Sequence, residues 1–275
     1  MTSNDIKNIC AKFDLYPSKS KGQNFLIDDN IVKKIITAAD LLPTDKILEI
    51  GPGLGVLTSE LLKVSGEVWA AELDKKIIEF LKVNYFRDLE TGKLKLIEGD
   101  ALKINFRELG LTDWSFKIVA NLPYCLTSKF FRQFLEFGPK STEIIVMIQK
   151  EVALRLMARQ GEMNLLALSA QFFSEPKMLF TVPRSCFWPE PEVESAVVQL
   201  KLKKKLPSVD IKQLFRIARI GFSAKRKQLH NNLSGGLKIK SVEVKRILAE
   251  LGLREDVRAQ DLRVEDWIKL TKRFG

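Results

Sequence analysis

Short apolar runs alternate with helical patterns between residues 29 and 150. Five runs are apolar almost throughout and predict strands buried on both faces, at residues 47–50, 68–73, 94–97, 116–120 and 144–148. Apolar residues with helical spacing separate several of these runs, at residues 56–63, 75–83 and 128–137. This alternation predicts an α/β fold, in which helices cover both faces of a mostly parallel sheet.

Beyond residue 150 we expect a helix to about residue 158, a break at Gly161 and a second helix over residues 164–173. In residues 195–202, by contrast, every second residue is apolar, and the residues between them are Val, Gln and Lys. This alternation predicts a late, antiparallel edge strand.

The pattern changes after the lysine-rich run at residues 201–205. Four short amphipathic helices are predicted beyond it, at residues 211–222, 225–233, 242–251 and 264–273. We therefore place a boundary near residue 205. It separates an α/β domain (residues 1–205) from an all-helical domain (residues 206–275).

Charge is divided along the same line. The 275 residues carry 45 Lys and Arg against 34 Asp and Glu, a net charge of +11. Residues 201–275 hold 20 of these basic and 8 of these acidic residues, a net of +12, which leaves −1 for the first 200. A near-neutral domain joined to a cationic one indicates a partner rich in phosphates or an anionic membrane surface.

Composition excludes several other classes. Three cysteines without metal-ligand spacing and a single histidine, His230, argue against a disulfide framework, a zinc site and a Ser-His-Asp hydrolase. Residues 1–12 lack the apolar stretch of a signal peptide, and no apolar run reaches the roughly 20 residues of a membrane span. We therefore expect a cytoplasmic protein without a metal site or a membrane partner.

Candidate chemistry begins with a glycine-rich turn after the first strand. Gly51, Gly53 and Gly55 let the backbone turn sharply and approach a ligand. Their GxGxG spacing differs from the GxGxxG of dinucleotide-binding folds, which argues against the interpretation that this loop binds a pyrophosphate. A tight turn without a ligand is an equally good interpretation of this loop alone.

Two carboxylates follow at the ends of the next two strands. Glu72 lies where an acidic residue can bind both hydroxyls of a ribose. Asp100 can accept a hydrogen bond from an exocyclic adenine amine. Either residue alone is more simply a solvated loop carboxylate, but together with the glycine turn they describe an adenosine pocket without a phosphate clamp.

The sequence Asn121-Leu122-Pro123-Tyr124 follows the fourth strand directly. Because Pro123 biases Leu122 away from helix, the Leu122 carbonyl can lie beside the Asn121 side-chain oxygen. Two adjacent acceptors suit an amino group, and the Tyr124 ring offers a face on which a base can stack. Without the upstream pocket, a strand-ending turn with a packed tyrosine would be preferred.

Three further segments carry candidate residues. Phe187, in the aromatic and proline-rich run at residues 187–191, can close the other face of a flipped base or simply pack. The polar and basic residues 19–26 can fold over a cofactor or form a surface turn. Lys225, Arg226 and Lys227 lie in the part that carries all of the excess charge, so nucleic-acid backbone binding is favoured over a solvated face.

Together these residues resemble the rRNA adenine N6,N6-dimethyltransferases, and most closely their bacterial small-subunit, kasugamycin-resistance branch. The resemblance covers nearly the whole chain and rests on ordered motifs: GQNFL at 22–26, EIGPGLGVLT at 49–58, Glu72 with Asp74, GDA at 99–101, NLPY at 121–124, QKEVALR at 149–155, FWPEPEVESAV at 187–197 and KRKQLHNNL at 225–233. Two departures are Lys21 and the pair Cys125-Leu126, which bear on substrate positioning.

The resemblance implies a class I methyltransferase fold with a helical C-terminal domain that helps the enzyme dock on the ribosomal subunit. It implies S-adenosylmethionine as cofactor, with contacts from the matching positions Asn24, Leu26, Gly51, Gly53, Glu72, Asp100 and Asn121. Residues 1–28 would contribute to this cofactor site.

The implied reaction is dimethylation of N6 on two adjacent adenosines in a loop near the 3′ end of 16S rRNA, as part of small-subunit biogenesis. The target base would stack between Tyr124 and Phe187. Asn121 and the Leu122 carbonyl would hold its amine, and the protein would act as a monomer. Two alternatives stay open: an enzyme acting on large-subunit rRNA, and a non-catalytic RNA-binding assembly or transcription factor that kept the fold.

Overall fold

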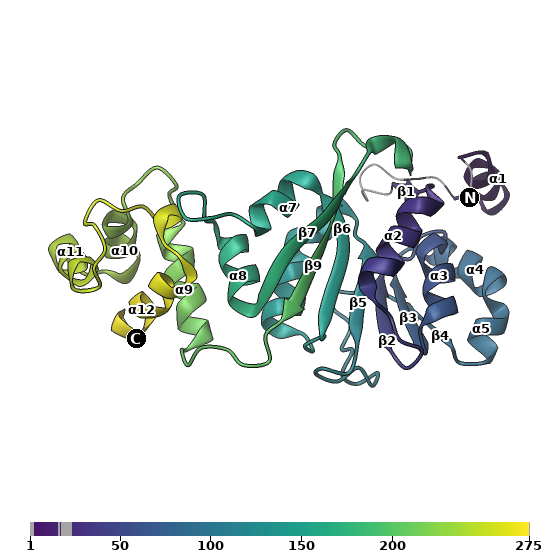
Figure 1. The fold of residues 1–275 in the computed structure, drawn as a ribbon, viewed down its shortest axis with the longest axis horizontal. Coiled ribbons are helices and arrows are strands. Elements are labelled where there is room, and N and C mark those ends of the chain that lie inside the picture. The colour runs from purple at the N-terminus through teal and green to yellow at the C-terminus, as the bar shows by residue number, and fades with distance from the viewer. Residues whose placement is uncertain (1–2, 16, 18–23, 275) are drawn as a thin grey trace. The chain divides into compact units, whose positions relative to one another are not determined.

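The computed structural model describes residues 3–15, 17 and 24–274, and the chain divides into two compact units (Figure 1). The first unit comprises Met1–Ala153 and Glu175–Leu202, and the second comprises Leu154–Ser174 and Lys203–Gly275. The third and last change of unit along the chain, after Leu202, falls close to the expected boundary at residue 205. Residues 154–174 belong to the second unit, although the sequence placed them with the first, because Phe173 stacks on Phe215 with ring centroids 5.7 Å apart.

The first unit is built on a seven-stranded sheet with the order β4-β3-β2-β5-β6-β9-β7. Its strands are β2 (Lys46–Ile50), β3 (Glu67–Glu72), β4 (Leu94–Glu98), β5 (Lys117–Asn121), β6 (Glu143–Gln149), β7 (Ser174–Val182) and β9 (Ser195–Leu202). The first five run parallel, and β9 is antiparallel to β6. The five strands predicted from apolar runs are thus confirmed within a residue or two.

The late strand β9 is antiparallel, as expected, but it is not an edge strand. Val197 and Val198 are both 0% exposed, so both faces of β9 are covered, and β7 occupies its outer side. The sequence analysis missed β7 because Glu175, Pro176 and Lys177 interrupt its apolar pattern. Proline is tolerated on an edge strand, where its missing N–H is not needed by the ladder.

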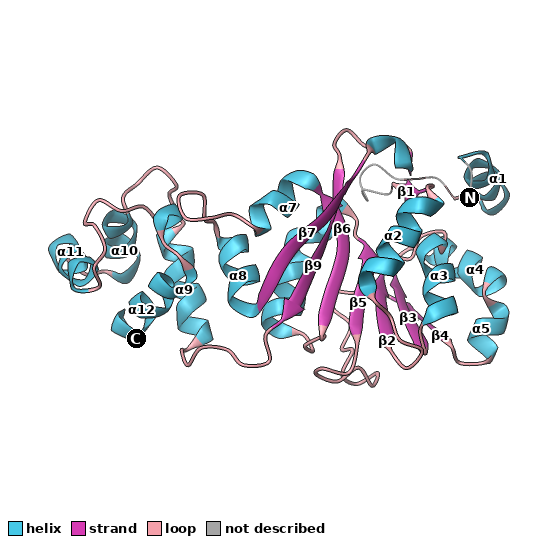
Figure 2. Ribbon diagram, viewed as in Figure 1, coloured by secondary structure: helices cyan, strands magenta, loops and turns pink. Residues whose placement is uncertain are grey.

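Helices cover both faces of this sheet (Figure 2). The helices of the first unit are α1 (Ser3–Phe13), α2 (Asp29–Ala39), α3 (Val56–Val64), α4 (Lys75–Asn84), α5 (Phe86–Glu90) and α6 (Thr127–Arg132), which continues as a π-helical segment (Gln133–Phe137). Ile47 and Val119 pack in one cluster with Ile35 of α2. Leu48 and Ile118 alternate with them along the strands and are equally buried, so the opposite face is covered too.

A two-stranded sheet joins two segments far apart in sequence. Strand β1 (Phe25–Leu26) pairs antiparallel with β8 (Phe187–Trp188), so that Leu26 lies opposite Phe187. The N-terminal helix α1 is anchored on α4 by an edge-to-face contact of Phe13 with Phe80. Two-residue strands have no periodicity, which is why the sequence analysis did not find them.

Helix α7 (Lys150–Leu156) crosses from the first unit to the second, whose helices are α8 (Leu165–Phe173), α9 (Ile211–Gly221), α10 (Leu229–Leu237), α11 (Ser241–Glu250) and α12 (Val264–Phe274). The core of this unit contains Trp267, which is 0% exposed and lies 5.2 Å from the Phe222 ring, centroid to centroid. No helix in the described ranges is long and apolar enough to cross a membrane.

One predicted helix begins later than expected. The helix predicted over residues 225–233 starts only at Leu229, and the three basic residues before it lie in a turn. The Asn232 side chain donates hydrogen bonds to the carbonyls of Gly221 (2.7 Å) and Ala224 (3.1 Å). These bonds give the two carbonyls a hydrogen-bond partner without helical backbone bonds, so a turn can separate α9 from α10.

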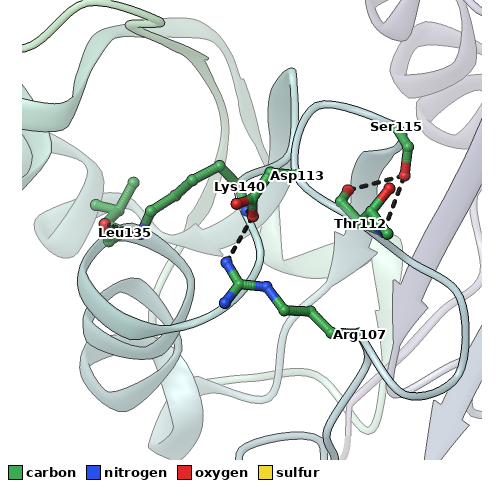
Figure 3. A network of polar contacts seen from close by, with 6 residues as sticks. All are labelled: Arg107, Thr112, Asp113, Ser115, Leu135 and Lys140. Carbon is green, nitrogen blue, oxygen red and sulfur yellow. Dashed lines mark hydrogen bonds and ion pairs between the residues drawn. The ribbon is translucent and has the colours of Figure 1, made fainter.

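A polar network lies at the amino-terminal ends of β5 and β6 (Figure 3). Asp113 accepts hydrogen bonds from Arg107 Nη2 and from the Lys140 backbone N–H, both at 2.7 Å. The Lys140 ammonium donates to the Leu135 carbonyl at 2.5 Å, and burial lowers the pKa of this lysine to about 8. The network attaches the β4–β5 loop to the turn that precedes β6.

Replacing Asp113 should therefore destabilise the first unit. We expect Asp113→Ala to lower the free energy of unfolding by about 1–2 kcal/mol, because the Lys140 N–H loses its acceptor. Urea denaturation followed by circular dichroism measures this change. Glu108→Ala is the matched control, since among the described residues the Glu108 side chain, in the same loop, accepts a hydrogen bond only from the exposed Asn105 side chain. An equal loss in both variants would contradict the role given to Asp113.

Candidate active site

The glycine-rich turn lies between the end of β2 and the start of α3. Gly53 and Gly55 have φ angles of +55° and +77°, which side chains rarely adopt. A Cβ atom at Gly53 would lie 3.3 Å from the Phe25 ring, and one at Gly55 would lie 2.5 Å from the Tyr85 hydroxyl. That hydroxyl donates to the Gly55 carbonyl at 2.7 Å. The turn is thus held by tight packing that only glycine allows.

The turn also lies where the strand order reverses. Strand β2 is flanked by β3 on one side and β5 on the other, and in such sheets ligands bind beyond the carboxyl ends of these strands. A cavity of about 360 Å³ occupies this position. Every described residue predicted for cofactor binding or catalysis lines it: Asn24, Leu26, Gly51, Gly53, Glu72, Asp100, Asn121, Leu122, Tyr124 and Phe187.

Glu72 is held rigidly at the end of β3. One carboxylate oxygen accepts the backbone N–H groups of Leu73 (2.8 Å) and Asp74 (2.9 Å). The other lies 3.4 Å from the Gly53 nitrogen. Burial raises the pKa of Glu72, and these backbone bonds oppose that shift. The side chain therefore connects β3 to the glycine turn at the edge of the cavity.

Glu49 is a second buried carboxyl group, for which the sequence analysis made no functional prediction. It is 1% exposed and accepts a hydrogen bond from the Thr58 hydroxyl at 2.6 Å. Burial raises the pKa of Glu49 to about 8, and the nearby charge of Glu72 raises it further, against the effect of Thr58. Glu49 is therefore mostly protonated at neutral pH.

The cavity is acidic. Four carboxyl side chains line it, those of Glu49, Glu72, Asp74 and Asp100, and no Lys, Arg or His side chain is among its described lining residues. A pyrophosphate would meet no compensating positive charge in this cavity. A ligand with a positive charge and a ribose fits its donors and acceptors better.

The second half of the cavity is formed by residues 121–124. Leu122 is buried, and its backbone N–H donates to the Met147 carbonyl at 3.1 Å, so β6 fixes the chain just after Asn121. A Cβ at Gly51 would lie 3.5 Å from the Pro123 ring, which shows how closely this segment approaches the glycine turn. The structure thus brings the predicted acceptors and the predicted adenosine pocket into one cavity.

Two aromatic side chains contribute differently. Tyr124 is half-buried, and its hydroxyl lies 2.8 Å from the Ser195 hydroxyl. Phe187 is only 3% exposed and belongs to the same core cluster as Leu26. Phe187 therefore has a packing role in the structure while also lining the cavity.

The basic residues predicted to bind RNA belong to the second unit. Lys225, Arg226 and Lys227 are all exposed, whereas His230 and Asn232 of the same motif are buried. The two ring nitrogens of His230 lie 2.7 Å from the Ser241 hydroxyl and 2.8 Å from the Gln228 side-chain oxygen. The second half of this motif is therefore structural.

Two positions depart from the family motifs, Lys21 and the pair Cys125-Leu126, and the structure describes only the second of them. Cys125 is exposed and lines the cavity beside Tyr124. Lys21, together with Gly22 and Gln23, lies outside the described residues.

Three residues that shape the site carried no functional prediction from the sequence: Glu49, Tyr85 and Ser195. Glu49 was visible only as a charge inside an apolar strand, a pattern that signals a partnered or protonated carboxyl group. The contacts of Tyr85 and Ser195 join positions 30 and 71 residues apart, so no local pattern could reveal them.

Comparison with known proteins gives a consistent picture. The sequence model of the family described as "Ribosomal RNA adenine dimethylase" matches residues 17–275. A relative from Dehalococcoides mccartyi (strain CBDB1), named "Ribosomal RNA small subunit methyltransferase A", is 41% identical over 98% of this chain and 92% of its own length. A relative of the same name from Desulfitobacterium hafniense (strain DSM 10664 / DCB-2) is 38% identical over 92% of this chain and 91% of its own.

Solved structures share the fold. The crystal structure of a dimethyladenosine transferase from Plasmodium falciparum has a TM-score of 0.76 and 28% identity, covering 91% of this chain and 97% of its own. The 23S rRNA methyltransferase ErmE has a TM-score of 0.70 at 23% identity, covering 91% of this chain and 99% of its own.

The protonated Glu49 predicts a specific pH dependence of stability. Its pKa rises from 4.5 to about 8 on folding, so the folded state binds more protons than the unfolded state between these values. Stability should therefore fall by up to about 1.4 kcal/mol per pH unit as the pH rises through this window. Glu49→Gln, which mimics the protonated form, should lack this contribution.

Urea denaturation of both proteins from pH 5 to pH 9 measures the difference. Glu79→Gln is the control, because Glu79 is an exposed glutamate of α4. Parallel pH profiles for Glu49→Gln and the wild type would show that Glu49 is ionised in the folded protein.

Proposed function

This chain belongs to the ribosomal RNA adenine dimethylase family, and we propose that it transfers methyl groups from S-adenosylmethionine to N6 of adenosine in small-subunit rRNA. The observation that carries this proposal is the acidic cavity at the strand-order reversal, with the Asn121–Tyr124 segment at its side. The names of the relatives from Dehalococcoides and Desulfitobacterium support the small subunit over the large one.

The cavity suits the charge and shape of this cofactor. The Glu72 oxygen near the Gly53 nitrogen has a second lone pair and can also accept hydrogen bonds from ribose hydroxyls, and Asp100 can accept one from the adenine amine. The carboxylates favour a positively charged sulfonium, and the lack of basic groups among the described lining residues disfavours a phosphate. When bound, the cofactor supplies an electrophilic methyl group. Asn24, Leu26, Gly51 and Gly53 would complete its binding site.

Asn121 and the Leu122 carbonyl would bind the target amine. An aromatic amine is a poor nucleophile because its lone pair is delocalised into the ring. Holding both N6 hydrogens on these two acceptors favours the pyramidal form, whose lone pair can form the new N–C bond as the S–C bond breaks. The excess proton leaves N6 for water, so no side-chain base is required. Catalysis then rests on positioning and electrostatics.

Tyr124 would offer a stacking face to the target base, with Phe187 supporting the opposite side of the pocket. Two rounds of transfer give the dimethyl product on each of two adjacent adenosines. A base in a loop is inexpensive to unstack, which suits a target near the 3′ end of 16S rRNA.

The second unit would dock on the RNA. Three exposed basic residues form no ion pair with another described residue: Lys225, Arg226 and Lys227. The carboxylates of this unit form ion pairs with other basic side chains instead, those of Lys245, Arg246, Arg254, Arg263 and Arg273. Unpaired exposed cations are free to neutralise phosphates. Residues 206–275 would thus supply docking and residues 1–205 catalysis, in a cytoplasmic monomer that acts on the immature small subunit.

Asn121→Ala should lower methyl transfer to purified unmethylated small subunits about 100-fold or more, because the amine is no longer held in line. Initial rates with labelled cofactor measure the change, and mapping of the product identifies the modified nucleotides. Asn105→Ala is the matched control, since Asn105 is exposed and bonds only Glu108. Transfer to adenosine at the wild-type rate by Asn121→Ala would refute the assignment.

Replacing Lys225, Arg226 and Lys227 together by Gln should weaken subunit binding and reduce its salt dependence. If each cation neutralises one phosphate, the slope of log K against log salt should fall in magnitude by about 2–3. Cofactor affinity should stay unchanged.

Binding titrations at several salt concentrations measure both quantities. The control replaces Lys46, Lys63 and Lys82 by Gln, because each of these exposed lysines is already paired with a glutamate. A loss of cofactor affinity with unchanged subunit binding would show that the division of labour is wrong.

A further inference from the structure

Ser195 is buried at the start of β9, behind the wall of the candidate active site. It is 0% exposed and pairs in register with Gln149 at the end of β6. The preceding residue, Glu194, is fixed by the Lys150 backbone N–H, which donates to its carbonyl at 2.9 Å, and by an ion pair with the Lys150 ammonium at 2.7 Å. The Ser195 hydroxyl is therefore presented from a rigid part of the sheet.

Ser195 is not among the residues that line the cavity. Its hydroxyl lies 2.8 Å from the Tyr124 hydroxyl, and no other hydrogen bond joins the Tyr124 ring to a described residue. The Tyr124 backbone is fixed separately, by the Thr127 hydroxyl, which donates to the Tyr124 carbonyl at 3.1 Å. The contact with Ser195 therefore acts on the orientation of the ring and not on the path of the chain.

The Tyr124 hydroxyl oxygen lies on the axis of the Cβ–Cγ bond, so a hydrogen bond to it restricts mainly the torsion about Cα–Cβ, which sets where the ring lies in the cavity wall. Burial raises the pKa of Tyr124, which keeps its phenol protonated and in need of a hydrogen-bond partner. Ser195 supplies that partner. Without it, the half-buried ring can swing about the Cα–Cβ bond, and the position of its stacking face relative to Asn121 is no longer fixed.

We propose that Ser195 is a positioning residue, which orients the Tyr124 ring so that the target adenine stacks with its amine at Asn121. This inference rests on the proposed function of the site, and it adds a residue that touches neither the cofactor cavity nor the reacting atoms. The ring orientation matters most when the base is aligned for transfer, so its loss should lower kcat more than it raises KM.

The test is a double-mutant cycle of Ser195→Ala and Tyr124→Phe, assayed on purified unmethylated small subunits. Each single variant removes the same hydrogen bond and keeps the aromatic ring. We expect each to lower kcat about 10-fold, with KM for the subunit and the cofactor dissociation constant within about 2-fold of wild type. The double variant should be no slower than the slower single variant, because the shared bond is already lost.

Ser141→Ala is the matched control, because Ser141 is also a buried serine of the first unit but its hydroxyl has no hydrogen-bond partner among the described residues. It should leave kcat unchanged. Thermal unfolding of all variants separates positioning from a general loss of stability.

Three results would overturn the inference. The first is a wild-type kcat in Ser195→Ala, and the second is a loss of kcat in the double variant equal to the product of the two single losses. The third is a loss of cofactor affinity as large as the loss of kcat. Absence of methylation by the wild-type protein would overturn the proposed function and this inference together. An active wild type with an equally active Ser195→Ala variant overturns the inference alone.

Discussion

A parallel sheet covered on both faces is the constraint on which the rest of this structure depends. Strands β2, β5 and β6 place apolar side chains on both sides, so the sheet interior offers almost no place for a polar group. Polar groups therefore gather mainly at the ends of the strands, and the candidate site lies at the carboxyl ends, where the chain turns back into helices. The reversal of strand order at β2 separates two of these turns and leaves the space in which the cavity forms. Glu49 is a buried carboxyl group inside strand β2, and it is tolerated because it holds a proton and has the Thr58 hydroxyl as a hydrogen-bond partner.

Charge is distributed in keeping with this geometry. The cavity is lined by carboxyl groups and disfavours phosphates, so a nucleic-acid substrate needs its backbone contacts elsewhere in the protein. In the proposed function, Lys225, Arg226 and Lys227 would meet that need, since they are exposed and form no ion pair with another described residue. A positively charged cofactor and a negatively charged substrate would then be recognised by different sets of residues.

Most of the fold could be predicted where the signal is local. The five parallel strands and the helices between them follow from runs and periods within a few residues. The predictions from sequence failed where contacts between residues far apart in the chain determine the local structure. Strand β7 is formed despite Pro176 because it lies at the sheet edge, and β1 and β8 exist only through each other. The basic residues at 225–227 have a helical pattern but lie in a turn, because Asn232 and Val257 satisfy the backbone groups around it.

The chemical groups of the candidate site and their order could be predicted from local sequence: a glycine turn, two carboxylates, a pair of acceptors and an aromatic ring, each at the end of a predicted strand. Parallel strands end at one edge of a sheet, which is why this order was enough to predict that the groups meet. How these groups are held, and which of them are charged, follows from the folded arrangement of the chain. The proton on Glu49, the packing of Phe187 and the bond between Tyr124 and Ser195 depend on burial and on contacts between residues far apart in the chain. Such contacts give no recognisable pattern in the sequence, because the two residues that meet are not separated by a fixed, repeating number of positions.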